Sequence, residues 1–257
     1  MAMFEDDYGD ILRKARSGLG LSGEECAARS GLPALEVKEL LAGGLRPREQ
    51  PLRKLAAVLG LSPGKLADLA LRPEPPRPVS VPPPFVFLPL DRAANAYVLG
   101  DSDTKKALIV DPGDEPDRIA EALTSLGLQP LLILVTHDHG DHVGALAEIR
   151  RRYPVPVVKA GHRALLEVGR MRGRVCDIPG HSPDSAVFVF EDRRVAFTGD
   201  ALFARSAGGA EPGAGYKSQL AGVATEVLSL PPGTVLCPGH GPLTTAGDEK
   251  RLNPFFP

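Results

Sequence analysis

The chain has 257 residues, of which 43% are hydrophobic and 24% charged, and its formal net charge at pH 7 is −2. This length exceeds one average domain and allows two unequal ones, while the composition is that of an ordinary soluble globular protein. The near balance of charge excludes a global attraction to nucleic acid or anionic lipid, so either partner would require a local basic patch.

The chain begins without a targeting pattern. Its first ten residues are acidic and contain no apolar core, which is unlike a secretory signal peptide. The longest apolar run, residues 131–135, is too short to cross a bilayer. The cysteines are three in number and lack CxxC spacing, which argues against a disulfide framework. We therefore expect a cytoplasmic protein with no membrane span.

Residues 1–71 are predicted to form a small all-α domain. Apolar residues recur at helical spacing there, and Ser, Gly and Pro stand at the positions that begin and end helices. The expected helices lie around residues 11–19, over 22–30, over 33–41 before Gly43-Gly44, over 52–59, and from Pro63 to Leu69.

A proline-rich segment, residues 72–84, follows the helices. Prolines this dense sustain neither a helix nor a sheet ladder, so an extended linker is expected. Residues 85–257 then change to a mixed α/β pattern typical of a layered domain. Strands are expected at 85–90, 96–99, 107–110, 131–135, 156–159, 186–190, 195–197 and 235–236, and helices at 115–126, 143–152 and 216–230.

The motif His137-x-His139-x-Asp141-His142 directly follows the apolar strand at 131–135. Alternate residues at the end of a strand point the same way, so the first three side chains can converge on one point. His142 begins the next predicted helix and can approach from the side. Imidazole and carboxylate together favour zinc, iron or manganese over calcium or magnesium.

Three further motifs place a glycine directly before a potential ligand, namely Gly180-His181, Gly199-Asp200 and Gly239-His240. A glycine permits a tight turn at each position, and loops at one end of a sheet can bring all the motifs together. An isolated histidine is more often structural, and we interpret His162, at a predicted helix start, in that way. The clustered residues instead predict a metal site of seven ligands, enough for two adjacent ions with an open position for water.

These motifs closely resemble the metallo-β-lactamase superfamily, an αββα sandwich with metals at one edge, over about residues 79–257. The segments THDHGDHVGAL, IPGHSPDSAVF, FTGDALF, CPGHGP and EKRLNPFF are similar to the glyoxalase II group within it. The resemblance implies that His137, His139 and His181 hold one metal, that Asp141, His142 and His240 hold the other, and that Asp200 bridges both.

The activity implied is that of a hydroxyacylglutathione hydrolase-like thioesterase. Two divalent ions, with zinc as the default and iron or manganese also suited, would generate a metal-bound hydroxide that attacks a small thioester or related ester. Asp141 would both ligate a metal and accept a proton as the catalytic carboxylate. Glutathione specificity is a separate question. The chain stops at Pro257, before the helical C-terminal extension of that group, and Gly209 stands where many relatives have an arginine.

A second enzyme class fits the same motifs. Persulfide dioxygenases resemble glyoxalase II closely, and that resemblance implies a single iron held by His137, His181 and Asp200. The motifs do not separate the two classes, whereas the identity and number of the metals would.

The helical part resembles the Cro/C1 helix-turn-helix family over residues 8–71, with 22–30 as the first helix of the motif and 33–41 as the recognition helix. The predicted recognition helix carries Glu36 and Glu39, and residues 1–72 hold eleven Lys and Arg against ten Asp and Glu. An ordinary solvated face is thus favoured over a phosphate-contacting strip at Arg46, Arg48, Arg53 and Lys54. The alternatives left open are a DNA-binding transcriptional regulator with a metallohydrolase sensor, and a unit for protein interaction or oligomerisation.

Overall fold

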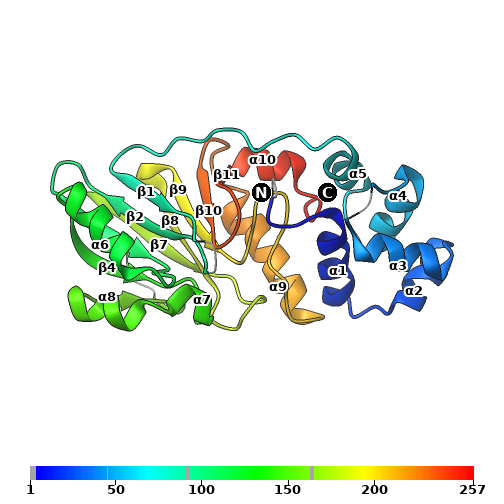
Figure 1. Cartoon of the computed structure of the whole chain (residues 1–257), viewed down its shortest axis with the longest axis horizontal. Coiled ribbons are helices and arrows are strands. Elements are labelled where there is room, and N and C mark those ends of the chain that lie inside the picture. The colour runs from blue at the N-terminus through cyan, green and yellow to red at the C-terminus, as the bar shows by residue number, and fades with distance from the viewer. Residues whose placement is uncertain (1–3, 45, 91–92, 163–164) are drawn as a thin grey trace.

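The computed structural model describes residues 4–44, 46–90, 93–162 and 165–257. Helices lie at one end of an elongated molecule, and two sheets with their flanking helices lie at the other end (Figure 1). The helices of the first end are α1 (Tyr8–Gly18), α2 (Gly23–Ser30), α3 (Ala34–Ala42), α4 (Glu49–Val58) and α5 (Pro63–Leu71).

The first helices begin and end where the local sequence dictates. Asp7 and Ser22 each accept a hydrogen bond from the third residue of the helix they precede, and that residue's carboxylate accepts one in return. Gly31, with a φ of 66°, ends α2 in the left-handed conformation that glycine adopts without strain. The helical pattern predicted for this part of the chain is therefore present, while its ability to bind DNA stays a prediction.

The predicted phosphate-contacting strip is partly neutralised within the helical part. Arg48 forms an ion pair with Glu36, and Arg53 pairs with Glu49 at 2.8 Å. Two of the four cations in that strip are thus paired with carboxylates of α3 and α4.

Two sheets form the rest of the chain. One has the strand order β1-β2-β3-β4-β5 and the other the order β11-β10-β9-β8-β7-β6. The first sheet comprises β1 (Phe85–Leu88), β2 (Ala96–Gly100), β3 (Lys106–Val110), β4 (Gln129–Leu134) and β5 (Val157–Val158). The second comprises β6 (Leu166–Val168), β7 (Met171–Asp177), β8 (Ala186–Phe190), β9 (Val195–Gly199), β10 (Val235–Pro238) and β11 (Thr244–Thr245).

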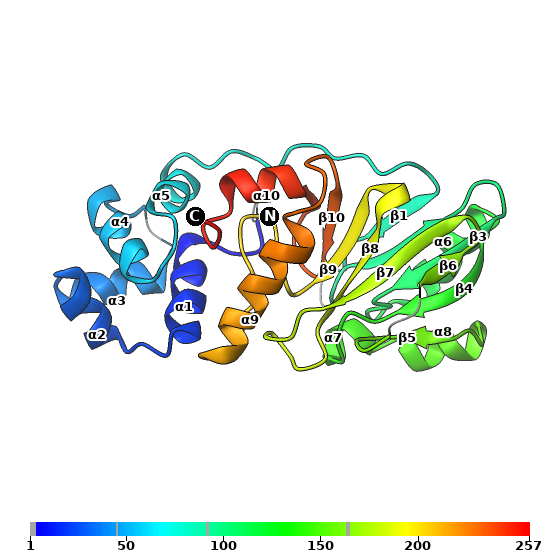
Figure 2. The same ribbon diagram turned by 180° about the vertical axis from the view of Figure 1, so that it is seen from behind.

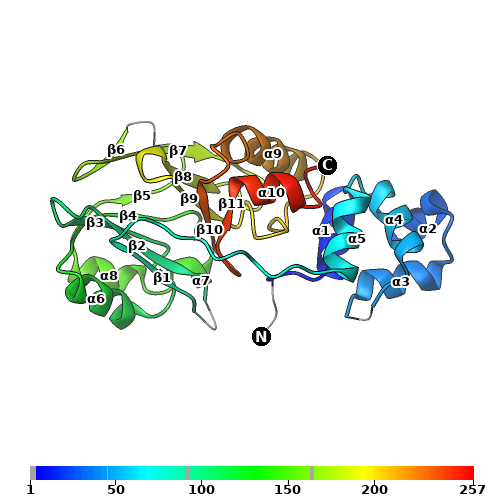
Figure 3. The same ribbon diagram turned by 90° about the horizontal axis from the view of Figure 1, so that it is seen from above.

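The sheets stack face to face, with helices against both outer faces (Figure 3). The helices are α6 (Pro116–Ser125), α7 (Gly140–Val143), α8 (Leu146–Arg152), α9 (Ala214–Gly222) and α10 (Ala246–Leu252), with a 3₁₀ turn at Glu191–Arg193 and a π-helical turn at Val223–Val227. Alternation along β2 creates the layers, because Tyr97 and Leu99 face the other sheet while Val98 packs beneath α6. The mixed α/β fold with two sheets is confirmed.

Several elements differ from the predictions. The helix expected at 143–152 is two helices, α7 and α8, because Gly144 and Ala145 pack against the loop after β3, where Ala145 N donates to Gly113 O at 2.6 Å. The helix expected at 216–230 passes into a π-helical turn. The helix start predicted at His162 is wrong in the described residues, since the next element there is strand β6.

The helical part packs directly on the two-sheet part (Figure 2). Tyr216 of α9 and Phe255 join the same buried apolar cluster as Ile11 and Leu12 of α1. Gly18 lies against the Tyr216 ring, and Gly213 N donates to Gly18 O at 2.8 Å. The packing therefore fixes α1 beside the loop that follows β9. In the described parts of the chain, each helix is too short or too polar to span a bilayer.

Candidate metal centre

The predicted ligands leave the sheets at one edge. β9 and β10 are parallel neighbours, so the residues that follow them, Asp200 and His240, emerge side by side. His181 lies in the turn between β7 and β8, and the His137 to His142 segment follows β4 of the opposite sheet. The facing of the two sheets brings these loops together.

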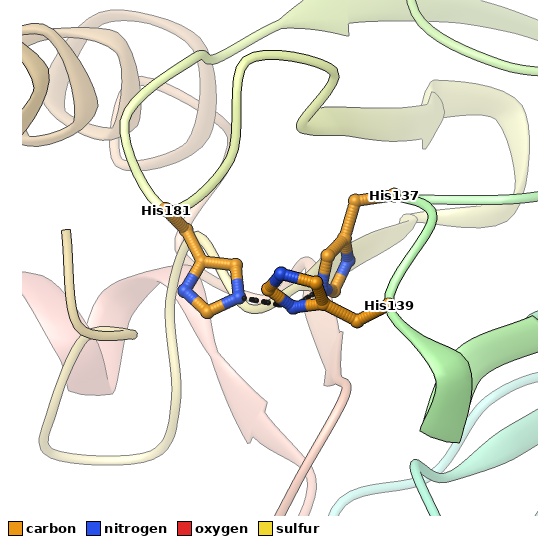
Figure 4. Close-up of side chains that lie close together, drawn as sticks. All are labelled: His137, His139 and His181. Carbon is orange, nitrogen blue, oxygen red and sulfur yellow. Dashed lines mark hydrogen bonds between the residues drawn. The ribbon is translucent and has the colours of Figure 1, made fainter. Parts of the chain in front are cut away.

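Three histidines form the first group of donors (Figure 4). His139 Nδ1 lies 2.9 Å from His137 Nε2 and 3.0 Å from His181 Nε2. Nitrogen atoms that bind one tetrahedral ion at about 2.0–2.1 Å each lie roughly 3.3 Å apart, so this spacing fits a shared cation.

Carboxylates extend the cluster on its other side. Asp200 lies between the groups, with Oδ1 3.3 Å from His142 Nε2 and Oδ2 3.5 Å from His181 Nε2. His240 Nε2 is 3.2 Å from Asp141 Oδ2 and 3.8 Å from Asp200 Oδ2. All seven predicted ligands are thus brought together, whereas His162 belongs to none of the clusters found among the described residues.

Hydrogen bonds fix which nitrogen of two histidines faces the cluster. His142 Nδ1 donates to Asp111 Oδ2 at 2.9 Å, and His181 Nδ1 donates to Gly209 O at 2.7 Å. The Nε2 atom of each ring is therefore directed at the cluster, which is how outer partners orient metal-binding histidines. The sequence analysis missed Asp111, because the Asp111-Pro112-Gly113 run after β3 has the composition of an ordinary turn.

Further polar contacts hold the loops that carry the donors. Asn95 Nδ2 donates to Pro238 O and to Gly241 O, both at 3.0 Å, and thereby fixes the turn around His240. Asp184 accepts from the Asp138 backbone N–H at 3.0 Å, which ties the histidine-rich loop to the turn that carries His181. Neither residue was predicted, because each acts on a loop far away in sequence.

Burial and neighbouring charges shift the pKa values of His137 and His142 in opposite directions. Burial, and then the nearby His142, lower the pKa of His137 to about 4, so this imidazole is neutral at pH 7. Burial also opposes charge on His142, but Asp111 and Asp200 outweigh it and raise its pKa to about 10. The pKa of Asp200 is lowered, because its histidine neighbours outweigh the effect of burial.

The donor set fits divalent cations. His142 Nε2 and Asp200 Oδ1 are buried, and neither has a hydrogen-bond partner within the part of the chain that the structure describes. Unsatisfied buried polar atoms are costly unless something else binds them. A Cβ at Gly239 would overlap Asp200 Oδ1 and come within 2.7 Å of His142 Cε1, so only glycine leaves these two donors in place.

The sequence matches the family model described as "Metallo-beta-lactamase superfamily" over residues 89–171 and 159–240, together more than half of the chain. The chain belongs to this superfamily. The match ends at His240, the last of the seven clustered donors, and it begins after the helices and the proline-rich segment.

Two relatives with a named activity belong to different enzyme classes. The hydroxyacylglutathione hydrolase GloC of Haemophilus influenzae is 28% identical over 188 residues, covering 60% of this chain and 89% of the relative. The mitochondrial persulfide dioxygenase ETHE1 of Mus musculus is 31% identical over 176 residues, covering 62% of this chain and 69% of the relative.

Solved structures share the superfamily fold. BLEG-1, a B3 metallo-beta-lactamase, is 32% identical with a TM-score of 0.61 and covers 67% of this chain and 99% of its own. TTHA1623, solved in a di-iron-bound form, is 33% identical with a TM-score of 0.56 and covers 66% of this chain and 98% of its own.

Proposed function

We propose that this protein is a metal-dependent hydrolase of the glyoxalase II-like group that cleaves a thioester or a related ester. The observation that carries the proposal is the convergence of seven nitrogen and oxygen donors in three overlapping groups, with Asp200 between the histidines of both sides. The similarity to a hydroxyacylglutathione hydrolase supports the substrate class.

Two divalent ions fit the donor set. His137, His139 and His181 would hold one ion, Asp141, His142 and His240 the other, and Asp200 would contact both. When bound, such ions lower the pKa of water and polarise a carbonyl group. The side chains themselves hold the donors in place, because Asp111 and Gly209 O orient the rings of His142 and His181.

Asp141 is suited to accept a proton. Its side chain is 40% exposed, whereas that of Asp200 is 9% exposed, so Asp141 forms the solvent-facing side of the cluster. A carboxylate in that position can take a proton from a nucleophilic water and release it to solvent. A thiolate leaving group is stable near neutral pH and needs no strong general acid, which favours a thioester over an amide.

The test is hydrolysis of a panel of thioesters and oxygen esters by the purified protein, before and after treatment with a chelator. We expect thioester hydrolysis that is lost on chelation and restored by adding Zn²⁺ or Mn²⁺. Hydrolysis that persists in metal-free protein would exclude the proposal, as would failure of every metal-loaded sample to cleave any member of the panel.

A persulfide dioxygenase is the second candidate, and the 31% identity to ETHE1 favours it. In that case one iron would be held by His137, His181 and Asp200. The donors Asp141, His142 and His240, whose ligand atoms lie within 4.8 Å of one another, would then hold no ion. Oxygen uptake with glutathione persulfide, by protein that contains one iron per chain, would establish the dioxygenase instead.

A further inference from the structure

A hollow of about 460 Å³ lies between helix α1 and the loop at residues 209–211. Its walls come from both parts of the chain, since α1 contributes one side and the loop after β9 the other. The lining residues are Arg13, Lys14, Arg16, Ser17, Gly209, Ala210 and Glu211.

The hollow adjoins the candidate metal centre. Gly209 lines it, and the carbonyl oxygen of the same residue accepts the hydrogen bond from His181. In the described part of the chain, a Cβ at Gly209 would meet no atom within 4 Å, so the space beside the His181 loop is open.

Lys14 brings α1 close to the other side of the metal centre. Its Nζ donates to Ala207 O at 3.0 Å and lies 4.8 Å from the centre of the Phe203 ring. That ring is in turn 5.8 Å from the His240 ring, centre to centre. One turn of α1 thus borders the cluster near both proposed ions.

Three cations line the hollow, and within the described residues one of them, Arg16, is left without an ion pair. Arg13 pairs with Asp10, and Lys14 pairs with Asp6. Arg16 has no ion pair among the residues that the structure describes, and its guanidinium donates to Leu21 O at 2.8 Å. Its Nε is shielded from solvent and has no partner in the described chain. Glu211 is the single acid in the lining, against three cations.

We propose that this hollow binds a carboxylate of the substrate, so that α1 forms a substrate-recognition wall beside the metal centre. Two arginines one helical turn apart on a concave surface suit a carboxylate, because each guanidinium offers several N–H donors in a fixed plane. The inference rests on the proposed function, since it names the class of thioester or ester that the same site takes, namely an anionic one.

The test uses two thioethers, which contain no thioester bond that the protein could cleave. S-methylglutathione carries two carboxylates, and its diamide, which contains neither a thioester nor an oxygen ester, carries none. Their affinities are measured by calorimetry on the metal-containing full-length protein, its Arg13→Gln/Arg16→Gln variant, and Arg29→Gln. The last variant is the matched control, because Arg29 is an exposed cation of α2 whose ion pair with Glu25 spans 3.8 Å.

We expect the natural protein and Arg29→Gln to bind the dicarboxylate at least about tenfold more tightly than the diamide, with added NaCl reducing the difference. The double variant should bind both compounds equally, and its unchanged affinity for the diamide shows that it is folded. Equal affinities in the natural protein, no binding of either compound, or a preference that survives in the double variant would each overturn the inference. Calorimetry measures binding and requires no catalysis. A protein that prefers the dicarboxylate but cleaves no thioester or ester would therefore refute the proposed function and leave the carboxylate-binding inference standing.

Discussion

Asp111 determines how His142 faces the candidate metal centre. Its Oδ2 accepts from His142 Nδ1, and its two oxygens also accept from the Thr136 backbone N–H at 2.8 Å and the Thr136 hydroxyl at 2.7 Å. The residue is 1% exposed, so these contacts lie in a dry environment where loss of charge is costly. Asp111 is thus a positioning residue for His142.

The first prediction concerns Asp111→Asn. Asn tolerates the positive φ of 45° found at this position, so the backbone should persist while the carboxylate charge is lost. We expect zinc affinity to fall by about 10- to 100-fold, which is the usual effect of removing the partner of a metal-binding histidine. Competition with a zinc chelator measures this. Asp103→Asn, which removes an exposed carboxylate paired with Arg170 at 2.5 Å, is the control. Equal affinities in both variants would refute the role of Asp111.

The same residue shows what the sequence could and could not reveal about the site. All seven clustered donors were predictable, because four lie within six positions and the rest follow glycines at strand ends. Asp111 was not, since its partners lie 25 and 31 residues away along the chain. An Asp-Pro-Gly run at the end of a strand has the composition of an ordinary turn, and only the pairing of β3 with β4 gives it a role.

At the scale of elements, local signals predicted the buried strands better than the partly exposed ones. β8 is a continuous apolar run, β9 begins with one, both are buried throughout, and both were expected. The sequence analysis missed β7 because Arg172 and Arg174 interrupt its apolar residues. The strand forms by pairing with β8, which lies beyond a turn in the sequence. The break between α7 and α8 could not be predicted from the local sequence either, because it depends on a contact with Gly113.

Asp101 joins the two sheets at the edge formed by their hairpin turns. It accepts from the Arg170 backbone N–H at 2.7 Å, and from the Thr104 hydroxyl at 2.8 Å in its own turn. Burial alone would raise the pKa of this carboxyl group, but these hydrogen bonds lower it to about 2.

The second prediction is a pH-dependent loss of stability in Asp101→Asn. A pKa below the unfolded value near 3.8 means that Asp101 stabilises the fold above about pH 4, and that this contribution is lost as the pH falls toward 2. The variant should lose about 1–2 kcal/mol of unfolding free energy at pH 7, the worth of charge-assisted hydrogen bonds, and the difference from the natural protein should shrink by pH 3. Urea unfolding at both pH values measures this, and a difference independent of pH would contradict the assignment.

At the scale of the whole molecule, the helical part and the two-sheet part share a buried core. The proline-rich segment predicted two units joined by an extended linker, which stays a prediction; residues 73–82 contain no helix or strand. The sequence did not predict that Tyr216 and Phe255 would complete the apolar cluster of α1, because such contacts span some 200 residues. Ser62 N donates to Pro254 O at 2.8 Å, which adds a polar link between the same two parts.

This packing places the helical part beside the candidate metal centre. α1 reaches the loop after β9, and Lys14 and the arginines near it border the hollow next to His181. Residues of one part can therefore influence chemistry in the other, and the elongated molecule can act as one enzyme.

The central claim is that the seven clustered side chains hold two divalent ions. The most direct measurement is elemental analysis of protein purified without chelators, combined with anomalous diffraction from its crystals. We predict two divalent ions per chain, with one anomalous peak among His137, His139 and His181, another among Asp141, His142 and His240, and Asp200 contacting both. A single peak, or a cluster that stays empty in crystals grown with excess zinc, would contradict the account.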